Sequence, residues 1–86
     1  MRSKDIKKIY NSAKWKKVRL EAMARDNFLC VMCLKDGVET KGDEVDHIIE
    51  VRDDILKAFD LDNLQFLCRS HHQQKTKREI NKRNLL

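Results

Sequence analysis

The sequence predicts a small α+β domain in which two helices flank a short β-hairpin. Three observations support this fold class: apolar residues at helical spacing near the N-terminus, short segments with β-branched residues in the middle, and a run of helix formers near the C-terminus. The 86 residues suffice for one domain, and a domain this small buries only about 60–65% of its unfolded surface. We therefore expect one domain over residues 1–86 that needs an additional stabilising element, such as a metal ion.

The first helix is expected from a Ser12 N-cap to about Arg25, because Trp15, Val18 and Ala22 recur on one helical face. The residues before it, 1–11, are expected to form a basic arm. The stretch NFLCVMCLKDG that follows the helix breaks the helical pattern and ends in Asp-Gly, which is a turn signal. We interpret this stretch as a knuckle.

An antiparallel hairpin is expected next, with strands at Val38–Thr40 and Glu44–Ile49 joined by Lys-Gly-Asp. Residues 50–60 form a charged connection with a helical turn at Ile55–Phe59. The segment LDNLQFL then leads into a final helix from about Arg69 to Asn81. These boundaries place the core at 12–81 and a short tail at 82–86.

Positive charge is concentrated at both ends of the chain. Residues 1–25 carry nine Lys or Arg against two acidic residues, residues 26–68 carry four against eleven, and residues 69–86 carry six against one. Solvated helices would explain the basic ends, but the whole pattern favours a polyanionic partner such as nucleic acid. The acidic middle would repel phosphate, and a divalent cation bound there would offset that repulsion. Candidates for contact with a nucleic-acid backbone are Lys14, Lys16, Lys17, Arg19, Lys75, Lys77 and Arg78.

Three cysteines and a histidine form two pairs of equal spacing, Cys30-x-x-Cys33 and Cys68-x-x-His71. Two intervening residues allow both side chains of a tight knuckle to reach one tetrahedral ion. The alternative is buried free cysteines, with His71 an ordinary residue at a helix start. An odd number of cysteines does not suit a disulfide framework, and we therefore favour a structural zinc site that joins the knuckle to the last helix.

A second group of polar residues has the composition of a reactive site. Asp46 and His47 are neighbours on an expected strand, so their side chains point to opposite faces unless the strand bends or the site straddles its edge. Asn63 and His72 follow downstream. Aspartate and histidine are suitable ligands for a divalent ion, and a further histidine is suited to act as a general base. A surface histidine beside a strand carboxylate is the alternative.

Taken together, these motifs resemble the HNH endonuclease family. The resemblance rests on C-x-x-C, EVDHII, DNLQ-x-LC, His-His and Lys-Thr in this order, and it covers roughly residues 10–78. It implies a ββα-metal (His-Me finger) fold with an N-terminal helix and a structural zinc knuckle. Many zinc-containing members read C-x-x-C-H at the last helix, so His71 stands where the fourth cysteine usually stands.

The resemblance also implies a role for each residue of the reactive site. His47 matches the general base, and Asp46 and His72 match the ligands of a catalytic ion, either Mg²⁺ or Mn²⁺, with Ni²⁺ or Zn²⁺ as alternatives. Asn63 matches the residue that holds the loop and orients the base. Adjacent residues of a helix diverge by about 100°, so His71 is expected to face the structural zinc while His72 faces the catalytic ion.

The expected function is metal-dependent hydrolysis of DNA phosphodiester bonds, by nicking or double-strand cleavage, by a monomer or weak dimer. Small phage members of the family suggest a context in genome packaging with terminase subunits. The principal alternative is a non-catalytic, zinc-dependent module that binds nucleic acid. Since no secretory signal and no apolar run of about 20 residues is present, we expect no membrane association and a cytoplasmic location, in a bacterial host if the protein is phage-encoded.

Overall fold

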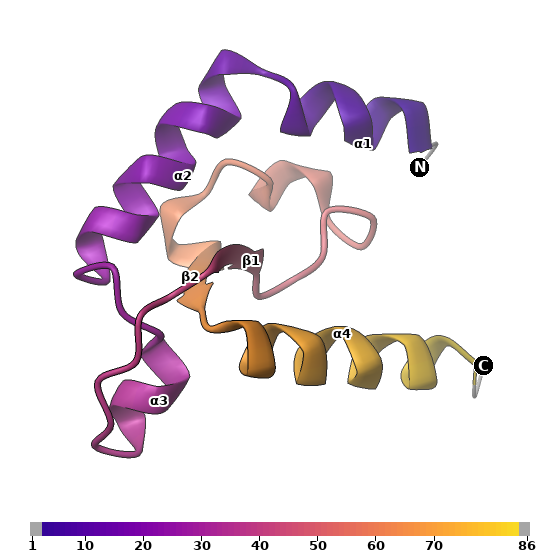
Figure 1. Ribbon diagram of the computed structural model, residues 1–86. Coiled ribbons are helices and arrows are strands. Elements are labelled where there is room, and N and C mark those ends of the chain that lie inside the picture. The colour runs from indigo at the N-terminus through magenta and orange to yellow at the C-terminus, as the bar shows by residue number, and fades with distance from the viewer. Residues whose placement is uncertain (1–2, 85–86) are drawn as a thin grey trace.

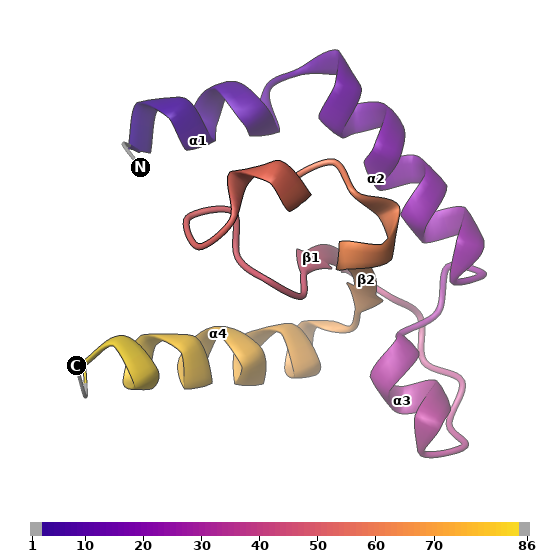
Figure 2. The ribbon, with the colours of Figure 1, turned by 180° about the vertical axis from the view of Figure 1, so that it is seen from behind.

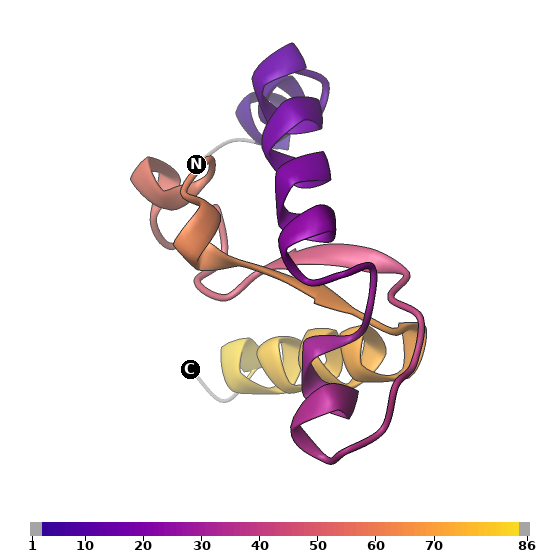
Figure 3. The same ribbon diagram turned by 90° about the vertical axis from the view of Figure 1, so that its left-hand side faces the viewer.

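A computed structural model describes residues 3–84 as a two-stranded sheet between helices (Figure 1). The elements are α1 (Ser3–Tyr10), α2 (Ala13–Arg25), α3 (Val31–Lys35), β1 (Glu44–His47), the 3₁₀ helices η1 (Ile55–Lys57) and η2 (Leu61–Asn63), β2 (Leu64–Leu67) and α4 (Arg69–Asn84). Seen from the side, α2 lies over one face of the sheet and α4 over the other (Figure 3). The α+β class predicted from the sequence is confirmed.

The predicted hairpin is wrong in its strand pairing. β1 pairs in antiparallel fashion with β2, with Asp46 opposite Gln65 and His47 opposite Leu64, whereas residues 38–40 form no strand. The physical reason is burial, because β2 supplies side chains that are almost fully buried while Val38 remains 53% exposed. Residues 38–41 instead pass beside the knuckle, where the Cys30 amide donates to the Thr40 carbonyl over 2.7 Å.

The predicted helix with its Ser12 N-cap is confirmed as α2. The Ser12 hydroxyl accepts a hydrogen bond from the Trp15 amide at 3.1 Å, which satisfies one of the free N–H groups of the first turn. Trp15, Val18 and Ala22 are buried, as their spacing predicts, and pack with Leu64 in the main core. This core places α2 firmly against β2.

The C-terminal end of α2 is tied to the second strand by two neighbouring charged residues. The Arg25 guanidinium donates to the carbonyls of Leu61 and Leu64 at 2.7 and 2.6 Å. The Asp26 carboxylate accepts a hydrogen bond from the Phe66 amide at 3.0 Å. Since Phe66 lies on the strand opposite β1, these contacts set the position of the sheet relative to α2.

The two ends of the chain are more helical than the sequence suggests. The expected N-terminal arm contains α1, which lies above the loop region between the strands when the molecule is seen from behind (Figure 2). α4 begins at Arg69 as predicted and continues to Asn84, beyond the predicted end at Asn81. The expected arm and tail also include residues 1–2 and 85–86, which lie outside the described residues. Among the described residues, no helix is long and apolar enough to cross a membrane.

Candidate active site and metal cluster

The predicted zinc ligands converge at the start of α4. Nδ1 of His71 lies 3.6, 3.4 and 3.2 Å from Sγ of Cys30, Cys33 and Cys68, and the last two sulfur atoms are 3.8 Å apart. A tetrahedral zinc ion with ordinary bond lengths would hold its sulfur ligands roughly 3.8 Å apart and nitrogen–sulfur pairs roughly 3.5 Å apart. The four side chains therefore fit a closed Cys₃His zinc site, and their ligand atoms all lie within 4.8 Å of one another.

The electrostatics of Cys30 also suit a metal ligand. Burial raises the pKa of its thiol, but hydrogen bonds from the backbone amides and the side chains of Cys33 and Cys68 together outweigh it and lower the pKa to about 6. Because the thiolate is the form that binds zinc, the lowered pKa favours the ligand form of Cys30. Cys30 is fully buried and packs with Leu67, so the ligand is part of the second core of the molecule.

The two adjacent histidines at the start of α4 face different sites, as the helical repeat predicts. His71 faces the cysteines, whereas Nε2 of His72 lies 3.8 Å from Oδ1 of Asp46 on β1. Adjacent ligands of an octahedral ion with bonds of about 2.1 Å lie about 3.0 Å apart, and opposite ligands about 4.2 Å apart. Asp46 and His72, at 3.8 Å, are about 0.8 Å farther apart than adjacent ligands, so the two side chains would have to close by that amount to bind one octahedral ion.

The Asp46 carboxylate is only 10% exposed, and two side chains contact one of its oxygen atoms. Its Oδ2 accepts a hydrogen bond from the Gln65 amide at 3.0 Å and lies 3.1 Å from the Lys75 ammonium. Lys75 also donates to the His47 carbonyl at 2.9 Å and forms an ion pair with Glu79. Lys75 is one of the candidates for contact with a nucleic-acid backbone, but its side chain is only 15% exposed and lies within the site.

His47 is held on the opposite side of β1 from Asp46. Its ring stacks on Trp15, with 4.8 Å between the centroids and 21° between the planes. Its Nε2 lies 2.9 Å from the carbonyl oxygen of Ala58. A carbonyl can only accept, so Nε2 carries the proton and Nδ1 keeps its lone pair. Burial is the main cause that lowers the pKa of His47, and the Ala58 carbonyl and Asp46 act in the opposite direction. The neutral, basic form of the imidazole is thereby favoured.

Asn63 connects the loop after β1 to the second strand. Its side-chain oxygen accepts from the Ile49 amide at 2.9 Å, and its amide nitrogen donates to the carbonyls of Ile49 and Lys57 at 3.0 and 3.2 Å. Lys57 immediately precedes Ala58, the residue whose carbonyl holds His47. Because all three of these hydrogen bonds go to the backbone, the Asn63 side chain is used to hold the loop.

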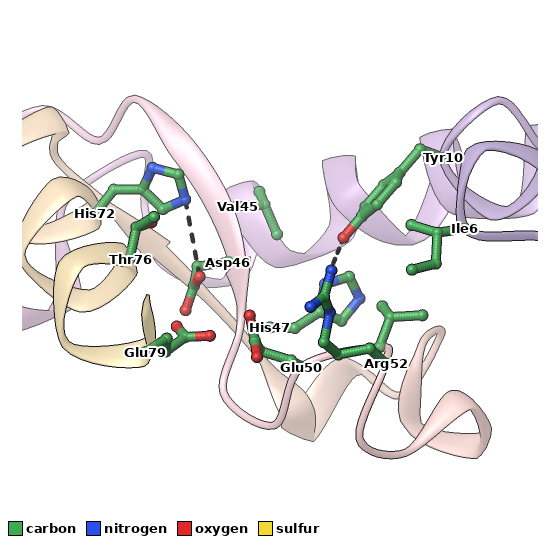
Figure 4. A pocket seen from close by; sticks show the side chains of 11 residues that line it. Ile6, Tyr10, Val45, Asp46, His47, Glu50, Arg52, His72, Thr76 and Glu79 are labelled. Carbon is green, nitrogen blue, oxygen red and sulfur yellow. Dashed lines mark hydrogen bonds and ion pairs between the residues drawn. The ribbon is translucent and has the colours of Figure 1, made fainter. Parts of the chain in front are cut away.

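A pocket of about 240 Å³ brings together three of the four predicted catalytic residues, Asp46, His47 and His72, whereas Asn63 does not line it. Figure 4 shows Asp46 and His72 pointing toward one another on one side of the β1 chain, and His47 near Tyr10 on the other. The conflict expected from neighbouring strand residues is thus resolved at the strand end, because the pocket extends around the edge of β1.

Besides the contacts of Lys75, Trp15 and Ala58 described above, two further site contacts were not predicted from the sequence. The Tyr10 hydroxyl lies 3.5 Å from Nδ1 of His47, at the outer limit of a hydrogen bond, and Gln65 contacts Asp46. No sequence signal indicates the first, because α1 folds back over a loop that is distant in the chain. The second follows only from the true strand pairing, which the predicted hairpin excluded.

Comparisons with known proteins identify a family and two similar proteins. The family model of the HNH endonucleases matches residues 30–78, a span that includes every predicted site residue. A probable HNH endonuclease of Lactococcus phage SK1 is 44% identical over 71 residues, which cover 78% of this chain and 73% of that protein. The crystal structure of the HNH endonuclease of deep-sea thermophilic bacteriophage GVE2 with manganese ion matches with a TM-score of 0.89 and 38% identity, over 92% of this chain and 86% of that one.

Proposed function

This chain belongs to the HNH endonuclease family, and from that premise we propose that it hydrolyses DNA phosphodiester bonds with a divalent ion held by Asp46 and His72. One observation carries the proposal. His47, with its Nε2 proton engaged by Ala58, shares a pocket with the Asp46–His72 pair. A base and a pair of metal ligands in one pocket are what metal-assisted hydrolysis requires.

His47 is the general base of the proposed reaction. Its Nδ1 takes a proton from a water molecule as the water oxygen attacks phosphorus and the bond from phosphorus to the 3′-oxygen breaks. The departing 3′-oxygen takes a proton from solvent water, and the products are a 5′-phosphate and a 3′-hydroxyl. Trp15 and the Ala58 carbonyl fix the orientation of the ring, and Asn63 holds the loop that carries Ala58.

The proposed metal ligands are Asp46 through Oδ1 and His72 through Nε2. A bound divalent ion would supply Lewis-acid stabilisation of the negative charge that develops on the phosphate and on the departing oxygen. Mn²⁺ and Mg²⁺ are the proposed ions, a choice supported by the manganese ion in the related GVE2 structure. The proposed role of Cys30, Cys33, Cys68 and His71 is to hold a structural zinc ion.

The path of the DNA backbone is proposed to run across α2. A second groove shares Tyr10, Val45 and His72 with the catalytic pocket and adds the cationic side chains of Lys16 and Arg19. Phosphate groups that flank the scissile bond would contact these cations beside the reactive centre. Replacing Lys16 or Arg19 with Ala should therefore reduce the slope of log Kd against log salt by about one each, whereas exposed Lys17, which does not line the groove, serves as the matched control.

The proposed function is tested by cleavage of supercoiled plasmid DNA with Mg²⁺, Mn²⁺, Ni²⁺ or Zn²⁺. His47→Ala should reduce the cleavage rate by at least about 10²-fold, as expected for loss of a general base. Zinc content and melting temperature are measured alongside, because His47 is buried against Trp15. Gln73→Ala, an exposed change beside His72, is the control. Undiminished cleavage by a folded His47→Ala variant would remove His47 as the base.

The same assay separates the enzyme from a non-catalytic zinc module that binds nucleic acid. Both would bind DNA through basic residues, but only the enzyme converts supercoiled plasmid into nicked or linear product. The ratio of these two products also reports whether one strand or both are cut.

The biological setting is proposed from the relatives and from the family resemblance. Both relatives are proteins of bacteriophages, which supports action in the cytoplasm of an infected bacterium, whereas a contribution to genome packaging rests on the resemblance to small phage members of the family. Co-purification with terminase subunits from infected cells tests that contribution, and sedimentation with and without DNA tests the expected monomer or weak dimer.

A further inference from the structure

The two oxygen atoms of the Asp46 carboxylate have different surroundings. Oδ2 receives the Gln65 amide at 3.0 Å and the Lys75 ammonium at 3.1 Å. Oδ1 instead faces Nε2 of His72 at 3.8 Å. One oxygen is therefore occupied by protein donors, and the other is directed toward the proposed ion.

The fold builds this asymmetry from two independent elements. Gln65 stands directly opposite Asp46 in the antiparallel ladder, so their side chains share one face of the sheet. Lys75 follows His72 by three residues on α4 and therefore lies on the same helical face. The Lys75 ammonium is also held by the His47 carbonyl and by Glu79. Neither donor depends on a metal ion for its position.

We propose that Gln65, together with Lys75, positions Asp46 so that it binds the ion through Oδ1 alone, and that this selects small octahedral ions over Ca²⁺. The proposal rests on the proposed function, in which Asp46 and His72 hold the ion. Ca²⁺ accepts six to eight oxygen ligands and readily takes a carboxylate through both oxygens, whereas Mg²⁺ requires near-octahedral geometry. A carboxylate whose second oxygen already accepts a hydrogen bond from Gln65 and forms an ion pair with Lys75 offers a single ligand atom, which suits the smaller ion.

Gln65 is the residue to change, because it is neutral. Removing Lys75 would mix two opposing effects, since loss of a positive charge favours any cation while loss of a donor frees the carboxylate. Gln65→Leu removes only the donor, and Gln65→Glu keeps the size of the side chain. Gln74→Leu is the matched control, because Gln74 is exposed and its amide donates to Ser70 outside the site.

The test is calorimetric titration of zinc-loaded protein with Mn²⁺ and with Ca²⁺ in separate experiments, together with a melting curve for each variant. Outer hydrogen-bond partners of metal ligands typically contribute 10–100-fold to affinity. Gln65→Leu should therefore raise the Kd for Mn²⁺ by about tenfold and the Kd for Ca²⁺ by much less, so that the ratio of the Ca²⁺ Kd to the Mn²⁺ Kd falls. Gln65→Glu should lower the same ratio, although its added charge strengthens binding of both ions. Gln74→Leu should leave the ratio unchanged.

The outcomes distinguish failure of this proposal from failure of the proposed function. If Asp46→Ala binds Mn²⁺ as the wild type does, the proposed metal site itself is wrong. If Asp46→Ala and His72→Ala lose Mn²⁺ binding while both Gln65 variants keep the wild-type Ca²⁺ to Mn²⁺ ratio, the site stands and the positioning role is refuted. A purely structural role of Gln65 in the sheet would change the melting temperature without changing that ratio. If Gln65→Leu does not fold, the ratio measured for Gln65→Glu decides.

Discussion

Asn63 offers a sharp test of how the loop behind His47, the proposed general base, is held. The side chain is 6% exposed and makes three hydrogen bonds to the backbone, one as acceptor from the Ile49 amide and two as donor to the carbonyls of Ile49 and Lys57. Asn63→Ala removes all three bonds at once. The loop that presents the Ala58 carbonyl to His47 then loses its principal side-chain link to β2.

The expected magnitude follows from these contacts. A buried hydrogen bond contributes on the order of 1 kcal/mol net, so losing three should lower the free energy of unfolding by about 3 kcal/mol. In a domain of this size, 1 kcal/mol corresponds to roughly 4–8 °C in Tm, and the expected decrease is therefore about 12–24 °C. Cleavage activity should fall as well, at temperatures where the variant is still folded, because the His47 ring is no longer fixed.

Asn63→Asp separates the donors of this side chain from its acceptor. The carboxylate keeps the hydrogen bond from the Ile49 amide but places an oxygen against the carbonyls of Ile49 and Lys57. Asn63→Asp should therefore be at least as destabilising as Asn63→Ala. Urea unfolding followed by circular dichroism, in buffer with zinc, measures both variants, and exposed Asn81→Ala on α4 is the control.

The reasoning would be refuted by Asn63→Asp with wild-type stability, because that result would mean that the amide donors contribute nothing. It would also be refuted if Asn63→Ala lowered the free energy of unfolding by less than about 0.5 kcal/mol, the range of an ordinary surface change.

Three further predictions concern the framework around the site. Cys30→Ser should abolish zinc binding and leave the domain unfolded at 25 °C, because a structural zinc site contributes on the order of 10 kcal/mol and total stability is about 5–15 kcal/mol. Atomic absorption and a melting curve measure this, and a full zinc equivalent with an unchanged Tm would reject the site. Gly42→Ala would place a methyl group within the buried ring of Phe66, so a loss of about 1–3 kcal/mol is expected in urea unfolding, and an unchanged midpoint would contradict the packing. Ser12→Ala removes the N-cap hydrogen bond from the Trp15 amide and should lower the free energy of unfolding by about 1 kcal/mol, again measured by urea unfolding. An unchanged free energy of unfolding would show that the cap does not stabilise α2.

Local signals in the sequence determined several parts of this molecule. The spacing of Trp15, Val18 and Ala22 predicts α2 and its buried face, and Ser12 predicts where it begins, because a helix repeats every 3.6 residues and needs a cap. The equal spacing of the two Cys/His pairs predicts the composition of the Cys₃His cluster, since a tetrahedral ion needs four suitable ligands whatever the rest of the fold does. The divergence of His71 and His72 follows from helical geometry in the same way.

Tertiary structure alone decided the strand pairing and the contacts that depend on it. Val38–Thr40 has the residue types of a strand, but β2 pairs with β1 instead, because Leu64, Phe66 and Leu67 bury far more apolar surface. The Asp46–Gln65 contact follows from that pairing, and the hydrogen bond from His47 to Ala58 depends on how the loop folds back. Such contacts join residues that are distant in the chain, and their free energy depends on competition among all possible partners. No local pattern contains the outcome of that competition. The ligand types and the divergence of His71 and His72 were therefore predictable, and the side chains and carbonyls that hold Asp46 and His47 were not.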